Sequence, residues 1–562
     1  MPAGLLEREL FVASPRSRST DDPATSAFTK AREVERRRTF AIISHPDAGK
    51  TTMTEKLLLF GGALREAGAV RARKAARHAT SDWLELEKQR GISVSSSVMH
   101  FEHAGYRVNI LDTPGHRDFS EDTYRTLVGA DSAVMLIDAA KGVEAQTRKL
   151  FEVCRLRHIP IFTFVNKMDR QGRDPLELLG EIEDVLGIDV VPVNWPVGQG
   201  SSFRGVYDRL DRALQLFSGG DHGTTKVDEA TVPGEPGDPA VCEEFGPDEE
   251  AVRDALTLLE GAGAEFDPAA VADGTQTPMF FGSALTNYAV LPFLRRFLEM
   301  APCPGPRLSD AGLIDPVENA FSGFVFKIQA NMDPDHRDRV AFVRICSGRF
   351  VKGNSSQHVP SGKRIRMANS TLLMGQNREE VEVAHPGDVV GLFDPGVFRI
   401  GDTISDTGGF SFPGIPTFSP ETFQRVEVAM VQKRKALEKG LDQLSQEGVV
   451  QVFRQAGGSS AGVILGGVGT LQFEVMQHRM ETEYGVELQL SPLPFELARW
   501  PQGEFDPGLF RYSERIMVVE DREGRPVLLA RSAFDIDRAI EKHPELRLSD
   551  TAVPELFETQ EN

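Results

Sequence analysis

A short stretch near the N-terminus combines a glycine, a lysine and hydroxyl side chains, residue types that bind phosphates and Mg²⁺. Its members are Ser44, His45, Pro46, Asp47, Ala48, Gly49, Lys50, Thr51 and Thr52. An apolar run at 40–43 precedes it and is typical of a buried strand, and 52–59 has the pattern of a helix. In a strand–loop–helix unit, backbone N–H groups at the helix start bind an anion. We therefore expect Lys50 to contact the β- and γ-phosphates of a nucleotide, and the Thr51 hydroxyl to bind Mg²⁺.

A second group of reactive residues follows the apolar run at 108–111. It consists of Asp112, Thr113, Pro114, Gly115 and His116. Asp112 at a strand end could hold Mg²⁺ through water, and Gly115 could bring its N–H close to a γ-phosphate. His116 is placed to orient an attacking water, so we expect it to be the catalytic residue. An Asp-Thr-Pro-Gly sequence alone also fits an ordinary turn, but its order after a phosphate loop favours catalysis.

A third group could read the base of a nucleotide. It follows the run at 160–165 and consists of Asn166, Lys167, Met168 and Asp169. The Asp169 carboxylate can accept both guanine N1–H and the exocyclic amine, a donor pair that adenine lacks. Asn166 could bond the base edge and brace the loop. A later segment, after 279–281, could close over the base with backbone N–H groups; it is Ser283, Ala284 and Leu285. The sequence thus predicts a site for GTP and GDP.

Strand and helix patterns alternate between these groups. Strands are expected at 108–111, 133–137 and 160–165, with helices around 144–157 and 176–186. Such alternation predicts an α/β domain with a mostly parallel sheet, whose ligands bind at the carboxyl ends of the strands. The segment Gln89, Arg90, Gly91, Ile92 and Ser93 lies between the first two groups. We expect the Ser93 hydroxyl to complete the Mg²⁺ shell when a γ-phosphate is bound.

Composition excludes several classes of function. A formal net charge of −20 over 562 residues disfavours nonspecific nucleic-acid binding, and we expect no DNA partner. The four cysteines have no CxxC spacing, which fits a reducing compartment. We find no signal-peptide pattern and no apolar run of 18 residues, so we expect a cytoplasmic protein without membrane contact.

The chain is expected to divide into three domains after an extension. Residues 1–34 are predicted to be disordered, and 35–305 to form a P-loop domain with an acidic surface insertion or flexible loop at about 219–250. Short strands and frequent turns predict a β-barrel domain over 306–413. From 414 to 562 the order strand–helix–strand–strand–helix–strand predicts an α+β ferredoxin-like domain, elaborated after Pro492.

The three motif groups, in this order, resemble those of the translational GTPases. The blocks at 44–52, 89–93, 112–127 and 324–342 are most similar to the bacterial peptide-chain release factor 3 family. The resemblance spans about 35–547 and implies a ribosome-stimulated GTPase that recycles class I release factors after termination. Its implied partners are the ribosome and the class I release factors, and we expect a monomer. Translational GTPases commonly carry threonine at the position of Ser93.

Two alternatives stay open. A translocation-type elongation factor or a ribosome-protection GTPase carries two further domains after the ferredoxin-like one, whereas only about 150 residues follow Gly414. A non-hydrolysing GTP-dependent scaffold would keep Lys50 and Asp169 but would have no need of His116. The Gly-Gly-Gln motif of class I release factors does not occur in the sequence, so we expect no hydrolysis of peptidyl-tRNA by this chain.

Overall fold

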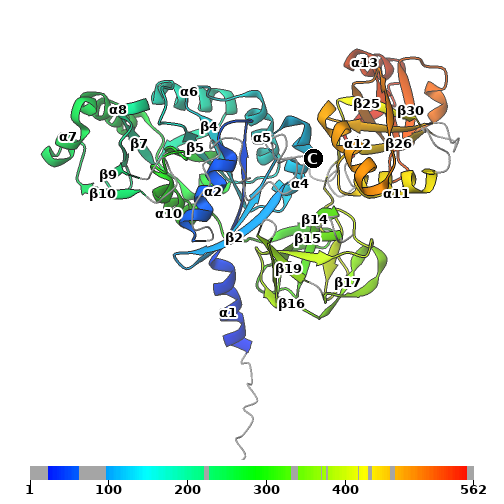
Figure 1. Ribbon diagram of the computed structural model, residues 1–562, viewed down its shortest axis with the longest axis horizontal. Helices are drawn as coiled ribbons and strands as arrows, with labels where there is room; N and C mark the ends of the chain where they lie inside the picture. The colour runs from blue at the N-terminus through cyan, green and yellow to red at the C-terminus, as the bar shows by residue number, and fades with distance from the viewer. Residues whose placement is uncertain are drawn as a thin grey trace, which may run out of the picture.

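The computed structural model describes most of the chain, and Figure 1 shows its elements in three groups. The described residues are 23–62, 96–114, 116–219, 227–330, 339–368, 370–374, 377–415, 417–427, 433–455 and 462–552. The predicted site residues Ser93 and Gly115 lie outside them, as does the whole segment 89–93. We use the names N-terminal domain, barrel domain and C-terminal domain for the three predicted ranges.

A seven-stranded sheet organises the N-terminal domain. Its order is β2-β3-β1-β4-β5-β11-β6, and neighbours are parallel except for β2 and β3. The strands are β1 Arg37–Ser44, β2 Ser97–His103, β3 Tyr106–Asp112, β4 Ser132–Asp138, β5 Ile161–Asn166, β6 Asp189–Pro192 and β11 Gln276–Phe281. The runs predicted as strands at 40–43, 108–111, 133–137 and 160–165 fall on β1, β3, β4 and β5.

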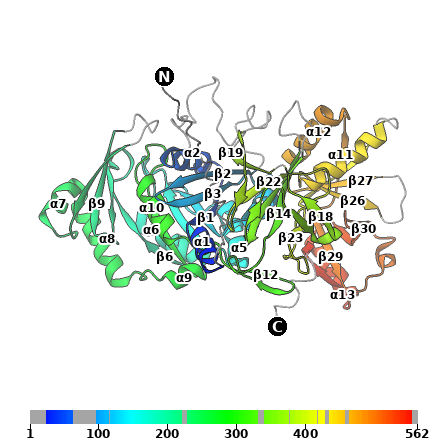
Figure 2. The same cartoon turned by 90° about the horizontal axis from the view of Figure 1, so that it is seen from below.

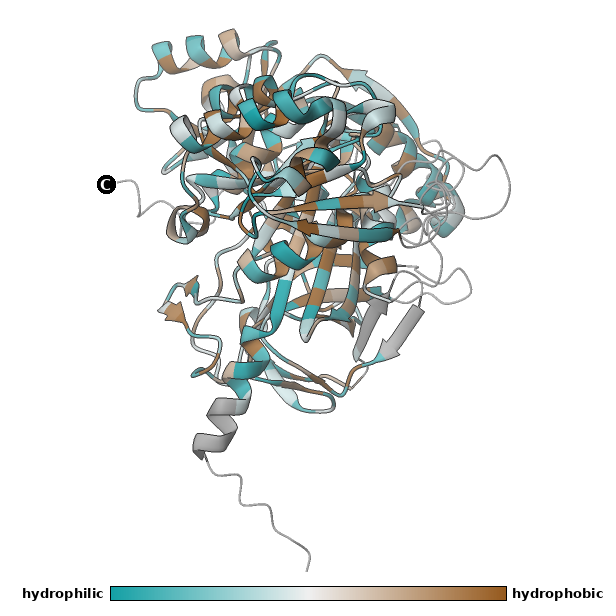
Figure 3. Ribbon diagram, turned by 90° about the vertical axis from the view of Figure 1, so that its left-hand side faces the viewer, coloured by the Kyte–Doolittle hydropathy of each residue, from teal (hydrophilic) through white to brown (hydrophobic). Residues whose placement is uncertain are grey.

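Helices cover both faces of this sheet, which explains why its central strands are apolar throughout. All eight residues of β1 are buried. Phe40 and Ile42 pack on one side with α2 and α10, and Ala41 and Ile43 pack on the other with α4, α5 and α6. The helices are α2 Lys50–Phe60, α4 Ser120–Val128, α5 Ala145–Leu156, α6 Pro175–Leu186 and α10 Val290–Met300. In Figure 3 the inner strands are largely brown, the colour of apolar residues.

The acidic region near residue 219 is ordered where the structure describes it. A four-stranded antiparallel sheet, β10-β9-β8-β7, lies at the end of the molecule opposite the C-terminal domain (Figure 2). Its strands and the helices that follow are β7 Asn194–Val197, β8 Gly205–Asp208, β9 Ala213–Ser218, β10 Asp228–Pro233, α7 Pro239–Phe245, α8 Glu249–Ala262 and α9 Pro268–Ala272. The flexible-loop alternative is wrong for 228–250, because β10 pairs with β9 and α7 buries Val241 and Phe245.

The N-terminal extension also contains a helix, α1 Pro23–Glu35, so the prediction of disorder over 1–34 is wrong for 23–34. Its last turn is attached to the start of β1. Arg37 Nη1 donates to the Glu33 carbonyl at 2.5 Å and to Glu33 Oε2 at 2.7 Å, and Val34 is buried. These contacts, made with residues beyond the extension, could not be read from its polar composition.

The barrel domain is built from short antiparallel strands, as predicted. The order of its main sheet is β18-β17-β23-β14-β15-β22-β19-β20, and Val325, Ile345 and Leu392 belong to its core. Its strands are β14 Ser322–Ala330, β15 Arg339–Ser347, β17 Ser355–His358, β18 Lys363–Arg366, β19 Ser370–Met374, β20 Asn377–Glu380, β22 Val389–Phe393 and β23 Thr403–Ser405. Two further pairs are β12 Arg307–Ser309 with β13 Gly312–Ile314, and β16 Phe350–Val351 with β21 Val383–Ala384.

A buried polar junction, made by Arg37, Asp131, Arg344 and the turn 385–388, joins the barrel domain to the N-terminal domain. Arg37 of β1 pairs with Asp388 at 2.9 Å, and their side chains are only 5% and 4% exposed. Arg344 of β15 forms a two-pronged pair with Asp131 at 2.6 and 2.8 Å. The carbonyl of Gly387 accepts hydrogen bonds from Thr39 and Arg344, each at 2.7 Å. Ion pairs buried in this way hold both partners to one geometry.

The Arg37–Asp388 pair leads to a prediction about stability. Burial alone would raise the pKa of Asp388, but Arg37 outweighs it and the pKa lies below its ordinary value. Asp388→Asn leaves the buried Arg37 with Glu33 as its remaining counter-charge, and the loss of the charged bond to Asp388 is expected to cost about 1.5–3 kcal/mol at neutral pH. Because the folded-state pKa is depressed, this contribution is present above the unfolded-state pKa of about 3.9 and is lost as pH falls through the folded-state pKa.

Thermal unfolding followed by calorimetry between pH 3 and 8 measures this effect. The unaltered chain and Asp388→Asn should differ most at neutral pH and converge in acid. Glu438→Gln is the control, since its partner Arg434 is 60% exposed and such surface pairs contribute little. A gap between the unfolding curves that does not depend on pH would contradict the assignment.

The C-terminal domain has the predicted ferredoxin-like order, and its sheet runs β28-β25-β27-β26 with antiparallel neighbours. Its elements are β25 Thr422–Glu427, α11 Arg434–Gln446, β26 Gln451–Gln455, β27 Val463–Gly467, α12 Thr470–Tyr484 and β28 Gln489–Leu493. The tail continues this sheet from β26 in the order β30-β31-β29-β32. The tail elements are β29 Leu497–Gln502, β30 Ile516–Glu520, β31 Pro526–Ala530, α13 Ala533–Lys542 and β32 Arg547–Ser549. Among the described residues, no helix has the length and apolarity needed to cross a membrane.

Candidate nucleotide-binding site

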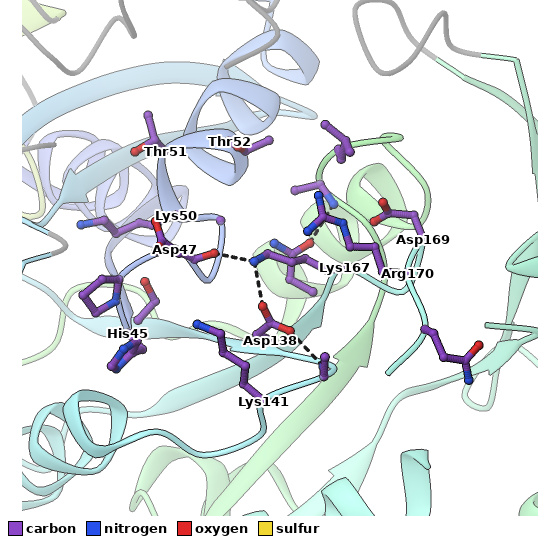
Figure 4. A pocket seen from close by; sticks show the side chains of 18 of the residues that line it. His45, Asp47, Lys50, Thr51, Thr52, Asp138, Lys141, Lys167, Asp169 and Arg170 are labelled. Carbon is purple, nitrogen blue, oxygen red and sulfur yellow. Dashed lines mark hydrogen bonds and ion pairs between the residues drawn. The ribbon is translucent and has the colours of Figure 1, made fainter. Parts of the chain in front are cut away.

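A cavity of about 630 Å³ lies at the carboxyl ends of β1, β4 and β5, the sheet edge at which the sequence predicts ligand binding. Figure 4 shows side chains from the loops after these strands converging on it. A volume of this size is typical of small-molecule sites. Its lining is Ser44, His45, Pro46, Asp47, Gly49, Lys50, Thr51, Thr52, His116, Asp138, Ala140, Lys141, Asn166, Lys167, Asp169, Arg170, Gln171, Ala284 and Leu285.

The loop between β1 and α2 has the backbone of an anion-binding turn. Asp47 and Gly49 have φ values of 66° and 103°, in the left-handed region. A side chain at Gly49 would also be excluded by space, because its Cβ would lie 2.3 Å from Asn166 Nδ2. No side chain caps the first turn of α2, which begins at Lys50. The N–H groups of that turn are therefore available to a phosphate.

Asn166 joins three of the predicted segments. Its Nδ2 donates to the carbonyl of Ala48 at 2.8 Å, and its Oδ1 accepts from the N–H of Ala284 at 2.9 Å. Both ends of the amide are thus used to brace the phosphate loop and the segment 283–285. Of the two predicted roles for Asn166, the structure shows the brace.

Asp169 is held by a side chain 114 residues away. The Ser283 hydroxyl donates to Asp169 Oδ1 at 2.6 Å and accepts from the N–H of Thr286 at 3.2 Å. Ser283 is fully buried and does not line the cavity. Its side chain therefore positions the carboxylate, whereas the sequence had suggested only backbone N–H groups for this segment.

Lys167 crosses the cavity wall in a left-handed conformation, with φ of 71°. Its ammonium donates to the carbonyl of Asp47 at 2.5 Å and to Asp138 Oδ2 at 2.7 Å (Figure 4). Burial alone would raise the pKa of Asp138, but the bonds from Lys167 and the Ala140 N–H keep it below its ordinary value. This carboxylate is therefore an ionised anchor for Lys167.

The segment after β3 is only partly at the cavity. Asp112 and Thr113 are buried, and Thr113 Oγ1 donates to the carbonyl of Ile42 at 2.7 Å. Thr54 Oγ1 donates to Asp112 Oδ1 at 3.3 Å. The His116 side chain lines the cavity and is 38% exposed.

The structure brings most predicted residues together and adds several. Among the predicted residues that the structure describes, those that do not line the cavity are Ala48, Asp112, Thr113, Pro114, Met168 and Ser283. The residues that line it without having been predicted are Asp138, Ala140, Lys141, Arg170 and Gln171. Asp138 ends β4 at the same sheet edge as the motifs, so the strand-end rule applied to 133–137 could have found it.

Comparison with known proteins identifies the family to which this chain belongs. The chain matches the models "Elongation factor Tu GTP binding domain" over 35–303, "Elongation factor G domain 2" over 320–407 and "Class II release factor RF3, C-terminal domain" over 412–540. It is 56% identical to peptide chain release factor 3 of Symbiobacterium thermophilum, covering 93% of this chain and 99% of that one. The chain belongs to the peptide chain release factor 3 family. It is thus a translational GTPase that binds guanine nucleotides, and the expected family and GTPase class are confirmed.

A further relative and a solved structure are also similar to this chain. Peptide chain release factor 3 of Synechococcus elongatus is 53% identical, with 92% of this chain and 93% of that one aligned. A solved structure from Thermus thermophilus matches with a TM-score of 0.64 and 24% identity, over 84% of this chain and 71% of that one. At that identity the likeness supports the fold alone. The cavity lies within the segment that matches the GTP-binding domain model.

In this release factor 3 family member we expect Asp169→Asn to weaken GTP binding on the order of 100-fold, since a charged hydrogen bond contributes about 1.5–3 kcal/mol. The amide can no longer accept two guanine donors but can donate to the extra carbonyl of xanthine. Affinities for GTP, XTP and ATP by fluorescence titration measure the change, with XTP expected to gain. Ser283→Ala is the matched control, because it loosens the carboxylate without removing it. Unaltered GTP affinity in Asp169→Asn would exclude Asp169 from the base site.

Proposed function

We propose that this chain is a ribosome-dependent GTPase that dissociates class I release factors from the ribosome after termination. The match of 412–540 to a class II release factor C-terminal domain, beside a GTP-binding domain, carries this proposal. The nearly full-length agreement with proteins named peptide chain release factor 3 supports it further. It would act in the cytoplasm, where bacterial ribosomes work.

Each part of the cavity fits one part of GTP. The loop 44–50 and the start of α2 would hold the phosphates, with Lys50 reaching the β- and γ-groups. Asp169, oriented by Ser283, would accept the guanine donors, and the backbone of Ala284 and Leu285 would cover the base.

A magnesium ion also fits the residues present. Thr51 offers a hydroxyl at the cavity and Asp112 a buried carboxylate near α2, both hard oxygen donors of the kind Mg²⁺ prefers. Within the described residues there is no group of three or more Asp, Glu, His or Cys side chains able to hold a metal. Such a sparse donor set suits an ion that shares its shell with water and substrate phosphates. Bound there, Mg²⁺ would neutralise charge on the phosphates.

Hydrolysis would place a water in line with the γ-phosphorus while the bond to the β–γ bridging oxygen breaks, giving GDP and phosphate. His116, at the cavity wall, would orient that water, and Gly115 would approach the γ-phosphate. Lys50 would neutralise charge that develops on the oxygens. The ribosome would complete the arrangement.

The test uses purified chain, GTP and ribosomes carrying a fluorescent class I release factor after peptide release. We expect GTP turnover to rise on the order of 10³-fold or more with ribosomes, and the labelled factor to dissociate only with GTP. Stimulated turnover without dissociation would favour an elongation or ribosome-protection role. Dissociation without turnover would favour a scaffold, and peptide release by this chain alone would exclude the proposal.

A further inference from the structure

His116 has a neighbour, Asp118, that can decide which ring nitrogen carries its proton. His116 Nδ1 lies 3.3 Å from Asp118 Oδ1 and 3.2 Å from the backbone N–H of Asp118. The hydrogen bond that the structure shows at Nδ1 comes from the backbone N–H, and the carboxylate oxygen lies within reach as the alternative partner. A single ring nitrogen can accept from the first or donate to the second, but not both at once. The two choices leave Nε2 in opposite states.

The chemistry differs between these states. If Nδ1–H donates to the Asp118 carboxylate, Nε2 keeps its lone pair and can accept a hydrogen bond from water. If Nδ1 accepts from the Asp118 N–H, Nε2 carries the proton and can only donate. An acidic group that fixes the tautomer of a histidine is a known requirement for histidine to act on a hydroxyl or water.

The position of Asp118 is set by the C-terminal domain. Its Oδ2 accepts from the backbone N–H of Leu471 at 3.0 Å, in the first turn of α12. The residue before that helix, Gly469, gives it no side-chain cap. A Cβ at Gly469 would lie 2.1 Å from Asp118 Cγ, although its φ of −153° suits any residue. Glycine is therefore required at this position because a side chain would collide with Asp118, and not because of its backbone conformation.

An apolar contact secures the same place. Phe119, next to Asp118 in the short helix η1 Arg117–Phe119, packs with Leu471 and Val475 of α12. The Phe119 ring also meets that of His116 edge-on, with centroids 6.3 Å apart. The segment that carries His116 is thus fastened to α12 by a hydrogen bond and by packing.

We propose that Asp118 is a positioning residue that transmits the docking of the C-terminal domain to His116. With Leu471 N–H bound to Oδ2, the carboxylate stays beside Nδ1, and a small turn of the ring that moves Nδ1 from the backbone N–H to Oδ1 leaves Nε2 as an acceptor. When α12 moves away, Asp118 loses this restraint and the ring loses that acceptor tautomer. The inference rests on the water-orienting role proposed for His116.

Asp118→Asn separates this role from simple docking. The Asn carbonyl can still accept from Leu471 N–H, but its NH₂ then faces Nδ1 and enforces the wrong tautomer. We expect kcat of ribosome-stimulated hydrolysis to fall on the order of 100-fold. GTP affinity and KM for ribosomes should stay within about twofold, and Asp118→Asn added to His116→Ala should cause no further loss.

Gly469→Ala tests the link between domains with Asp118 intact. Its methyl group would displace the carboxylate, so we expect kcat to fall about tenfold with unchanged GTP affinity. Gly261→Ala in α8, where an added Cβ would meet nothing within 4 Å, is the matched control and should behave like the unaltered chain.

The outcomes are distinct. Unchanged kcat in Asp118→Asn, while His116→Ala loses stimulated turnover, would overturn this inference and leave the proposed function standing. If Asp118→Asn lowered GTP affinity by the same factor as kcat, Asp118 would have a structural role, and the inference would also be overturned. Full stimulated turnover in His116→Ala would remove the role of His116 and the inference with it.

Discussion

His116→Ala is expected to bind GTP as tightly as the unaltered chain and to lose most of its ribosome-stimulated hydrolysis. The side chain lines the cavity but is 38% exposed, so removing it leaves the loop 44–50 and the Asp169 site intact. A partner that completes a GTPase site from outside raises the rate of hydrolysis on the order of 10³–10⁵-fold. Without His116 to orient the attacking water, most of this rise in rate should be lost.

Single-turnover hydrolysis with saturating ribosomes, together with nucleotide titration, measures both quantities. His478→Ala, which removes an exposed imidazole from α12, controls for loss of a histidine as such. The result that contradicts the assignment is a His116→Ala rate within tenfold of the unaltered one. Weakened GTP binding would instead place His116 in substrate binding.

Lys50→Ala is expected to lose nucleotide affinity on the order of 100-fold or more. Lys50 is buried at the cavity wall, where its ammonium can make charge-assisted bonds of about 1.5–3 kcal/mol each to phosphate oxygens. Thr51→Ala should behave differently, because its hydroxyl is expected to act through Mg²⁺. Thr51→Ala should lose much of its affinity for GTP when Mg²⁺ is present and little of its affinity for GDP when a chelator removes Mg²⁺.

Fluorescent GDP and GTP titrated with and without Mg²⁺ distinguish the two variants. Each serves as the control of the other, since they alter adjacent residues at the start of the same helix. Full nucleotide binding by Lys50→Ala would refute the phosphate-loop assignment. Equal losses in both variants would point to damage of α2.

Local patterns predicted the parts of the site that adjoin one strand. The run before Ser44 and the helix after Lys50 are contiguous in sequence, so their apolar spacing predicted the strand–loop–helix unit that the structure shows. Asp112 and Asn166 were predicted because each ends an apolar strand; of the two, Asn166 lines the cavity. The ferredoxin-like order was predicted for the same reason, since its elements alternate without interruption.

Contacts between distant segments could not be read in this way. The Ser283–Asp169 bond joins residues 114 positions apart, and nothing near Ser283 in the sequence indicates a partner. The helix at Val241 and Phe245 was hidden by surrounding acidic residues, because two buried side chains suffice to dock so short a helix. The tail strands add to a sheet edge that exists only after the domain has folded.

The N-terminal and barrel domains are joined tightly enough to be expected to move as one rigid unit. The buried pairs Arg37–Asp388 and Arg344–Asp131 tie β1 and its neighbours to the barrel, and Phe326 of β14 shares a core with Leu127 of α4. The C-terminal domain meets the N-terminal domain through the hydrogen bond from Leu471 N–H to Asp118 and a small apolar cluster, and also through a Gln451–Glu121 hydrogen bond, an exposed Lys149–Glu421 pair and a Tyr124–Phe418 ring contact. We therefore expect a rotation of the barrel domain to carry the nucleotide cavity with it, and a rotation of the C-terminal domain to change the contacts of Asp118, two residues from His116.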